Sequence, residues 1–190
     1  MPGLLADWLS SAEGTVRVAL DGPPCAQPEL LADALAARVQ ELGRPFAHVR
    51  ADTFWRDASL RLEYGREDVD SYLNWLDAGA LEREVLSPTG SYLPSLRDPS
   101  NNRATRSERV ELPDGAVLVV SGAFLLGLGL SFDRVVHLQV SPAARARRTP
   151  ASESWTLPAF DRYDAEVDPS ALADLVIKLD DPAHPALLTG

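Results

Sequence analysis

The segment between the first apolar run and the first long helical pattern is where a phosphate-binding loop would stand. The pair Asp21-Gly22 follows the run 15–20, and the eight residues from Gly22 read G-P-P-C-A-Q-P-E. A working loop reads G-x-x-x-x-G-K-[S/T]: backbone N–H groups surround the phosphates, the lysine neutralises them and the hydroxyl holds Mg²⁺. Only the first glycine of that pattern is present, so by motif alone the segment is an ordinary turn between a strand and a helix.

Each replacement in this loop acts against a bound triphosphate. Gln27 stands at the second glycine, where a side chain disfavours positive φ. Pro28 replaces the lysine and has no N–H to donate. Glu29 replaces the hydroxyl and puts a carboxylate at the helix N-terminus that would otherwise attract phosphate. Because no lysine or arginine lies between 22 and 29, we expect no ATP, no Mg²⁺ and no metal site.

Cys25, in the same loop, offers a different chemistry. It is the only cysteine in the chain. A thiol just before a helix N-terminus can have a lowered pKa and act as a nucleophile, with His48 or His137 approaching from elsewhere in the chain. A small, unreactive, buried residue is the favoured alternative, and the sequence leaves the reactivity of Cys25 open.

Composition excludes several classes of protein. The chain has 190 residues and a net charge of −10, which argues against a general nucleic-acid binder. No apolar run approaches the ~20 residues of a membrane span, and the start, M-P-G-L-L-A-D-W-L-S-S-A-E-G, lacks the basic segment of a signal peptide. A single cysteine fits a reducing compartment, so we expect a cytoplasmic protein. Lys178 is the only lysine, so any lysine chemistry would have to use it.

Alternating strand and helix patterns position these residues. Apolar and β-branched runs predict strands at 15–20, 46–51, 115–120, 134–140 and 175–179, and a helical period predicts a helix from Pro28 to about residue 42. We predict a second helix at 70–86 and a short one within 1–14 that caps a sheet edge. Residues 91–112 read as a loop or small hairpin, 143–148 as a short helix at most, and 149–168 as irregular. Together these elements predict one domain over 1–190, a three-layer α/β sandwich with a parallel sheet of about five strands.

The chain resembles bacterial uridine kinase-like proteins from about residue 15 to residue 185. Five stretches carry the resemblance in order: R-V-A-L-D-G-P from Arg17, D-T-F-W-R from Asp52, V-L-V-V-S-G-A-F-L-L from Val117, A-E-V-D-P from Ala165 and A-D-L-V-I from Ala173. The resemblance implies a P-loop NTPase fold of the nucleoside kinase type, with a parallel core, a substrate pocket and a mobile lid.

The resemblance also implies roles for acidic and aromatic residues. Asp52 matches the catalytic Asp that takes the proton from the 5′-hydroxyl of the nucleoside, although Asp after a strand is also a common turn cap. Asp77 matches an Asp that binds the sugar, with a solvated helix residue as the alternative. Four aromatic side chains are candidates to stack on a base, or else belong to the core: Phe54, Trp55, Tyr64 and Tyr72.

Two departures from the family concern the nucleotide side. Ser121 stands where the family has an acid that organises Mg²⁺ through water. The lid, from about 145 to 168, is shortened. Arg145, Arg147 and Arg148 correspond to lid arginines that clamp phosphates, or else they form a solvated short helix.

These observations favour a uridine kinase-like protein with a dismantled ATP and Mg²⁺ site that keeps at most a nucleoside or small-molecule pocket. Phosphoryl transfer depends on positioning and on charge stabilisation, and several of those groups are missing together. The alternative is an active ATP-dependent kinase whose lid arginines replace the loop lysine. A structural partner subunit is a third class. We expect a small-molecule ligand, no nucleic acid and no membrane, and leave a homodimer open.

Overall fold

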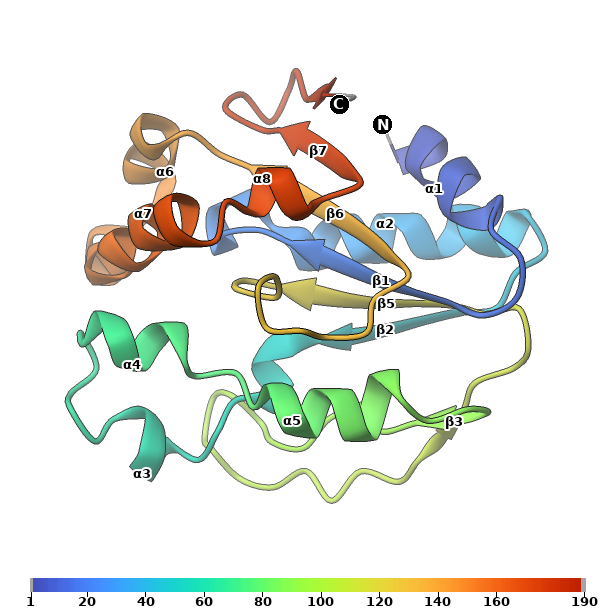
Figure 1. The fold of residues 1–190 in the computed structure, drawn as a ribbon, viewed down its shortest axis with the longest axis horizontal. Helices are drawn as coiled ribbons and strands as arrows, with labels where there is room; N and C mark the ends of the chain where they lie inside the picture. The colour runs from blue at the N-terminus through green and yellow to red at the C-terminus, as the bar shows by residue number, and fades with distance from the viewer. Residues whose placement is uncertain (1, 189–190) are drawn as a thin grey trace.

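A computed structural model describes residues 2–188, so Met1 and residues 189–190 of the predicted domain 1–190 lie outside the described part. Its centre is a six-stranded sheet in the order β2-β5-β1-β6-β7-β8 (Figure 1). The strands are β1 (Val16–Asp21), β2 (Phe46–Arg50), β5 (Val117–Gly122), β6 (Arg134–Gln139), β7 (Leu175–Lys178) and β8 (Ala186–Leu188). The first five in the sheet order run parallel, and β8 pairs with β7 in the antiparallel sense.

The central strands are apolar along their whole length because both of their faces are covered. Strand β5 is buried at every position and lies between β1 and β2, with Val117 opposite Val16 on one side and Phe46 on the other. A continuous apolar run of this kind is what a parallel strand with two covered faces requires. The predicted α/β fold with about five parallel strands is therefore confirmed.

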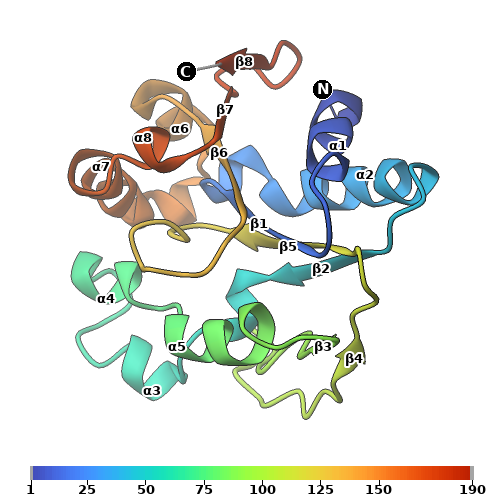
Figure 2. The same cartoon turned by 45° about the vertical axis from the view of Figure 1, so that its right-hand side comes forward.

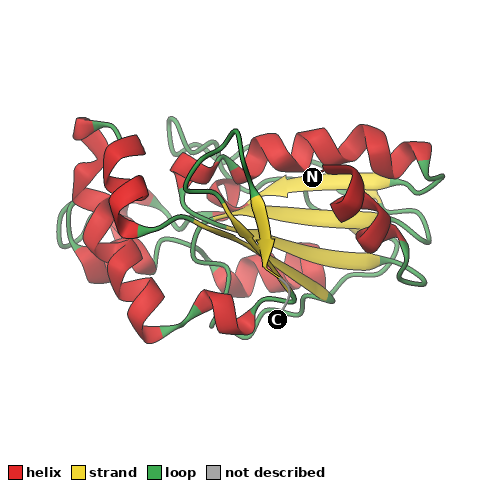
Figure 3. Cartoon of the chain, turned by 90° about the horizontal axis from the view of Figure 1, so that it is seen from above, coloured by secondary structure: helices red, strands yellow, loops and turns green. Residues whose placement is uncertain are grey.

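One face of the sheet is covered by α1 (Pro2–Ser10) and α2 (Pro28–Glu41), as the view from above shows (Figure 3). Leu5 and Leu9 of α1 share a core cluster with Leu35 and Val39 of α2 and with the sheet residue Val18. The N-terminal helix was expected to cap a sheet edge. It packs on this face beside α2 instead, because its apolar residues are buried in the same core cluster as those of α2.

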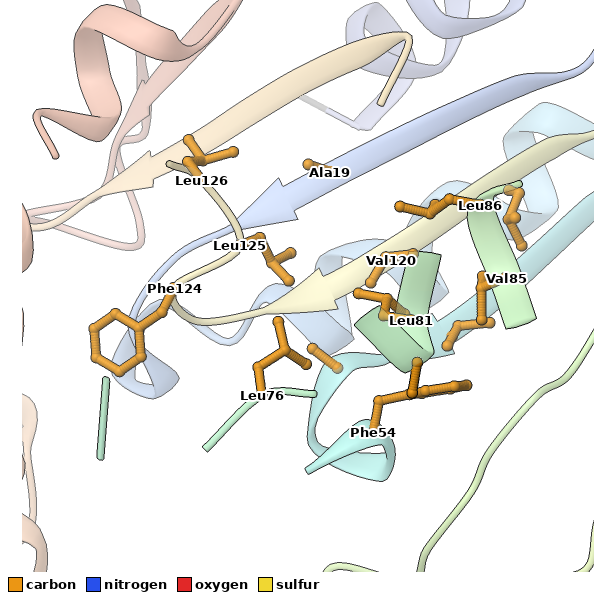
Figure 4. Packing of buried hydrophobic residues seen from close by; sticks show 14 of the residues in the cluster. Ala19, Phe54, Leu76, Leu81, Val85, Leu86, Val120, Phe124, Leu125 and Leu126 are labelled. Carbon is orange, nitrogen blue, oxygen red and sulfur yellow. The ribbon is translucent and has the colours of Figure 1, made fainter. Parts of the chain in front are cut away.

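The other face is covered by α5 (Ala78–Leu81) and its π-helical continuation η3 (Glu82–Leu86), and α7 (Leu157–Glu166) adds Ala159, Phe160 and Tyr163 to the same core cluster from beyond the strand ends. Figure 4 shows how the side chains Leu81, Val85 and Leu86 point at the sheet beside Val120 and the buried ring of Phe54. The two helical faces and the sheet make the three layers.

The predicted helix 70–86 is wrong as a continuous element. The structure has α4 (Val69–Leu73), an interruption at 74–77, and then α5. The interruption pairs with the chain after β2: the Arg56 N–H donates to the Trp75 carbonyl at 2.7 Å, and the Asp77 N–H donates to the Phe54 carbonyl at 2.9 Å. The Asp77 carboxylate then caps α5 by accepting the Ala80 N–H at 2.9 Å.

The region 149–168 was expected to be irregular and is mostly helical. It holds the 3₁₀ segment η4 (Ala151–Thr156) and α7, after the predicted short helix α6 (Pro142–Arg148) and before α8 (Pro169–Leu172). Pro158 breaks nothing because it lies in the first turn of α7, where no N–H bond is lost. The predicted hairpin in 91–112 is confirmed as the antiparallel pair β3 (Ser91–Tyr92) and β4 (Val110–Glu111).

Short segments and helices gather at the carboxyl ends of the parallel strands (Figures 1 and 2). Turn η1 (Pro24–Ala26) follows β1, and η2 (Ala51–Phe54) follows β2. Helix α3 (Ala58–Arg61), α4, α6 and α7 lie beyond them. Within residues 2–188, no helix is both long enough and apolar enough to cross a membrane.

Candidate functional site

A cleft of about 1090 Å³ opens at the carboxyl ends of β1, β2 and β5. Its walls come from the loop after β1, from η2, from the start of the loop after β5, and from α3, α4 and η4. Ligands of open α/β sheets bind at this end of the strands. The cleft is as large as the larger small-molecule sites of proteins.

The loop after β1 folds back on itself as the 3₁₀ turn η1. The Ala26 N–H donates to the Pro23 carbonyl at 2.8 Å, and the Gln27 N–H donates to the Pro24 carbonyl at 3.0 Å. Pro23, Pro24 and Pro28 have no N–H. In a phosphate-binding loop these N–H groups point at phosphate oxygens. Here the prolines and the turn remove most of the donors that a triphosphate needs.

Gly22 keeps the first glycine of the pattern for a reason that involves no phosphate. Its N–H donates to the Gly122 carbonyl at 2.9 Å. A Cβ at this position would lie 2.7 Å from Leu138 Cβ, which is too close for any side chain. The glycine therefore allows β6 to approach the end of β1.

Gln27 adopts the left-handed conformation, with φ 57° and ψ 54°, directly before α2. The sequence led us to expect that glutamine would disfavour this conformation. The backbone nevertheless keeps the course that a second glycine would give it, although a non-glycine residue there costs about 1–2 kcal/mol.

Replacing Gln27 by glycine should raise the free energy of unfolding by about 0.5–1 kcal/mol, because the relief of strain exceeds the added chain entropy. Urea unfolding measures this change. Ala37→Gly, at an exposed position inside α2, is the control and should lower the free energy of unfolding by about 1 kcal/mol. If the free energy of unfolding fell by the same amount in both variants, the backbone at Gln27 would not be strained.

The three lid arginines have different positions. Arg148 reaches the cleft, where it donates to the carbonyl oxygens of Cys25 and Leu179 and so braces the loop. Arg145 is buried and forms ion pairs with Asp161 at 2.6 Å and Asp164 at 2.9 Å. Arg147 is exposed and is not among the residues that line the cleft.

Ser121 is held by a histidine. Its Oγ lies 2.8 Å from His48 Nε2, and His48 Nδ1 lies 3.1 Å from Asp33 Oδ1. The order Ser, His, Asp matches a hydrolase triad, but Ser121 is fully buried, so no substrate carbonyl reaches its Oγ. Mg²⁺ prefers carboxylates and water, and a hydroxyl bound to imidazole does not fit it. Among residues 2–188, no cluster of three or more His, Cys, Asp or Glu is arranged to hold a metal ion. At this position the chain therefore offers a hydroxyl bound to imidazole, where the family resemblance led us to expect an acid.

Asp52 lies at the start of the segment after β2 and lines the cleft. Its Oδ2 pairs with the Arg50 guanidinium at 2.5 Å, whereas its Oδ1 is buried without a hydrogen-bond partner. Buried carboxylate oxygens without a partner are rare in folded proteins. Asp52 therefore offers an acceptor for a donor on a bound molecule.

The aromatic candidates divide between cleft and core. Trp55 and Tyr72 line the cleft. Phe54 is fully buried in the core, Tyr64 is 75 % exposed and is not on the cleft wall, and Asp77 caps α5 away from it. Sequence reasoning missed much of the wall, including Arg61, Trp75, Phe124 and Trp155.

The sequence and the structure were compared with those of known proteins. No protein-family model matches the chain, and no curated protein sequence matches it. A structure from Bacillus stearothermophilus, described as a possible uridine kinase, aligns with a TM-score of 0.71 at 21% identity, over 90% of this chain and 96% of that one. The chain has a uridine kinase-like, P-loop kinase-type fold.

Two further structures share this kinase-type fold. A protein from Silicibacter sp. TM1040, described as a candidate fructose transport system kinase, aligns with a TM-score of 0.59 at 20% identity, over 84% of this chain and 94% of that one. The YGR205w protein aligns with a TM-score of 0.58 at 11% identity, over 98% of this chain and 94% of that one. The likeness extends over most of each chain, so the fold as a whole is shared.

Under the loop of this kinase-type fold lies a buried polar group that the sequence did not reveal. Asp21 is fully buried, its Oδ2 lies 2.8 Å from His137 Nδ1, and its Oδ1 accepts the Leu125 N–H at 2.9 Å. The Tyr163 hydroxyl accepts the Leu126 N–H at 3.0 Å, and burial followed by the charge of Asp21 raises the Tyr163 pKa far above its ordinary value. These bonds fix the start of the loop after β5.

The Cys25 thiol should react slowly with iodoacetamide at neutral pH. Burial raises its pKa, and the positive charges of Arg148 and Arg145 do not outweigh that effect. The thiolate is the reactive form, so the labelling rate should still rise above pH ~8.5, where a free thiol is half ionised. Labelling followed by mass spectrometry over a pH series tests this. A labelling rate that is already at its plateau at pH 7 would show that the thiol is ionised there and would support a nucleophilic role for Cys25.

Proposed function

We propose that this protein binds a small, nucleoside-like molecule in the cleft and does not transfer phosphate from ATP. The observation that carries the proposal is the 3₁₀ turn η1, in which the N–H groups of Ala26 and Gln27 bond to the loop's own carbonyls. No lysine compensates, because Lys178 lies on β7, where its nearest acidic partner is Asp180 at 3.7 Å.

The wall of the cleft that carries Asp52, Trp55 and Tyr72 supports ligand binding. The partly buried ring of Trp55 offers a flat surface on which a base can stack, beside the buried ring of Tyr72 on the same wall. Asp52 lines the cleft, where its carboxylate can accept a hydrogen bond from a hydroxyl of the ligand. A nucleoside supplies both features, and one structural neighbour is described as a possible uridine kinase.

Two measurements on the native protein test the proposal. Calorimetric titration with uridine should give saturable binding, and Asp52→Asn should weaken it about ten-fold, because a hydrogen bond to a charged group is lost. Asp114→Asn, at an exposed turn position, is the matched control and should bind as the native protein does. A coupled assay with Mg-ATP and uridine should show no uridine-dependent ADP formation. Turnover in that assay, or a failure of uridine to bind, would overturn the proposal.

The second candidate function is an active kinase that uses Arg148 in place of the lysine. The observation in its favour is the position of the Arg148 guanidinium, which touches the loop at Cys25 and lines the cleft. In that case uridine-dependent ADP formation would be measurable, and Arg148→Ala would lower it by about 10²–10³. Arg147→Ala, outside the cleft, would be its control.

A further inference from the structure

Arg61 is a buried guanidinium that faces the cleft without an acidic partner. It ends α3 and lines the cleft, and only 8% of its surface is exposed. Its Nε donates to the Arg56 carbonyl at 2.8 Å. Neither of its terminal nitrogens donates to another residue within 2–188, and it forms no ion pair with the acidic residues of that range.

The acidic residue that acts on Arg61 already has a positively charged partner. Asp57, the cap of α3, forms an ion pair with Arg97 at 3.0 Å. Burial lowers the pKa of Arg61, the attraction of Asp57 raises it and Arg97 lowers it again. The guanidinium still stays charged at neutral pH. A buried charge without a counter-ion destabilises a fold, so an external anion is the partner that this position lacks.

Two tryptophan rings hold the guanidinium in place. Its Cζ lies 4.6 Å from the centroid of Trp75 and 5.0 Å from that of Trp55, and the two rings meet edge to face at 5.1 Å. Cation–π contacts fix the position of the charge. The rings accept no in-plane hydrogen bond, so the terminal N–H groups stay available to a ligand.

A second donor without a partner lies on the same wall. Trp155 Nε1 is buried without a hydrogen-bond partner, and its ring centroid lies 5.9 Å from that of Trp75. Arg66 lies 5.1 Å from the Trp155 ring, and its charge is compensated by Glu153 at 3.0 Å. This wall therefore combines flat apolar rings with hydrogen-bond donors and one uncompensated positive charge.

We propose that this wall binds an oxyanion, either a carboxylate or a phosphate, carried by a ligand whose flat aromatic body stacks on Trp55, Trp75 or Tyr72. Both oxyanions accept two parallel hydrogen bonds from a guanidinium, and the surrounding rings strengthen those bonds by excluding water. An anionic aromatic compound should therefore bind the cleft more tightly than a neutral nucleoside does. This inference rests on the proposed function for the cleft as the binding site, and it narrows the class of ligand.

Two matched pairs of probes test the preference in the native protein by titration calorimetry. Uridine and uridine 5′-monophosphate differ by a phosphate, and benzamide and benzoate differ by a carboxylate charge. At least one anion should bind about ten-fold more tightly than its neutral partner. The pair that shows the preference identifies the oxyanion. Equal affinity within both pairs, or no binding of either anion, overturns the inference.

Variants locate the effect at Arg61. Arg61→Met removes the charge and keeps a long side chain. The anion and its neutral partner should then bind with about equal affinity. Arg83→Gln, an exposed arginine on η3, is the control and should keep the preference. Because methionine removes an unpaired buried charge, the Tm of the free Arg61→Met protein should equal or exceed that of the native protein. An anion preference that survives in Arg61→Met overturns the inference.

A conservative variant covers the case in which Arg61→Met does not fold. Arg61→Lys keeps the charge but loses the planar fork, so its anion preference should be smaller than the native one and still above one-fold. An unchanged preference in Arg61→Lys would show that the guanidinium makes no paired contact and would overturn the inference. The proposed function fails on different readouts, which are an absence of uridine binding or uridine-dependent ADP formation. The inference fails on the ratio of the affinities within a pair, which can equal one even when uridine binds.

Discussion

Replacing Asp21 by alanine should lower the free energy of unfolding by about 3–5 kcal/mol, since it breaks a fully buried polar pair. The substitution leaves the His137 ring nitrogen and the Leu125 N–H without the carboxylate that both now contact. His137 is only 4% exposed, so water does not replace the lost partner. Urea unfolding at neutral pH measures the loss.

The control for Asp21 is an aspartate at the surface. Asp7 on α1 lies 3.5 Å from Arg38, and 53% of its side chain is exposed. Asp7→Ala should lower the free energy of unfolding by no more than about 1 kcal/mol. Asp21→Asn, which keeps an acceptor for the Leu125 N–H, should lose less than Asp21→Ala. Equal, small losses in all three variants would show that the buried pair contributes nothing.

Rebuilding the loop should raise the affinity for Mg-ATP by at least about 100-fold, because it restores two or more hydrogen bonds to charged phosphate oxygens, each worth about 1.5–3 kcal/mol. The variant combines Pro24→Ser, Gln27→Gly, Pro28→Lys and Glu29→Thr. It removes the proline that starts η1, restores a lysine and a hydroxyl, and keeps the left-handed backbone that position 27 already has. Calorimetric titration with Mg-ATP measures the gain.

The control for the rebuilt loop carries only Pro28→Lys and Glu29→Thr. It adds the charge and the hydroxyl but leaves the Ala26 and Gln27 N–H groups bonded to Pro23 and Pro24, so its gain should be much smaller. Comparable gains in both variants would show that charge alone was missing. Failure of the full variant, with its Tm unchanged, would place the obstacle elsewhere in the cleft, at Ser121 or in the lid.

The sheet could be predicted from the sequence because its strands are buried on both faces. Each parallel strand reads as an apolar, β-branched run, and that pattern is local. The same local information failed at 74–77, where Asp77 and Trp75 bond to the chain after β2. It also failed in α7, whose spacing of Ala159, Phe160 and Tyr163 fits a helix even though Pro150 and Pro158 argue against one.

Local sequence pattern predicted the candidate site where its residues follow the ends of strands, whereas Tyr72 and Arg148 of the cleft were named through the family resemblance. The loop at 22–29 and Asp52 were visible for that reason. The pairs Asp21 with His137 and Ser121 with His48 join residues far apart in the chain, and nothing in the local pattern links them. The wall around Arg61 could not be predicted either, since Trp55, Trp75 and Trp155 come from three separate segments.

The most direct test of the account is titration calorimetry of the native protein with Mg-ATP. The central claim is that the loop after β1 offers a triphosphate too few N–H donors and no lysine. We therefore predict no saturable heat up to millimolar nucleotide, in a sample that binds its small-molecule ligand. Saturable binding of Mg-ATP in the micromolar range would contradict the claim.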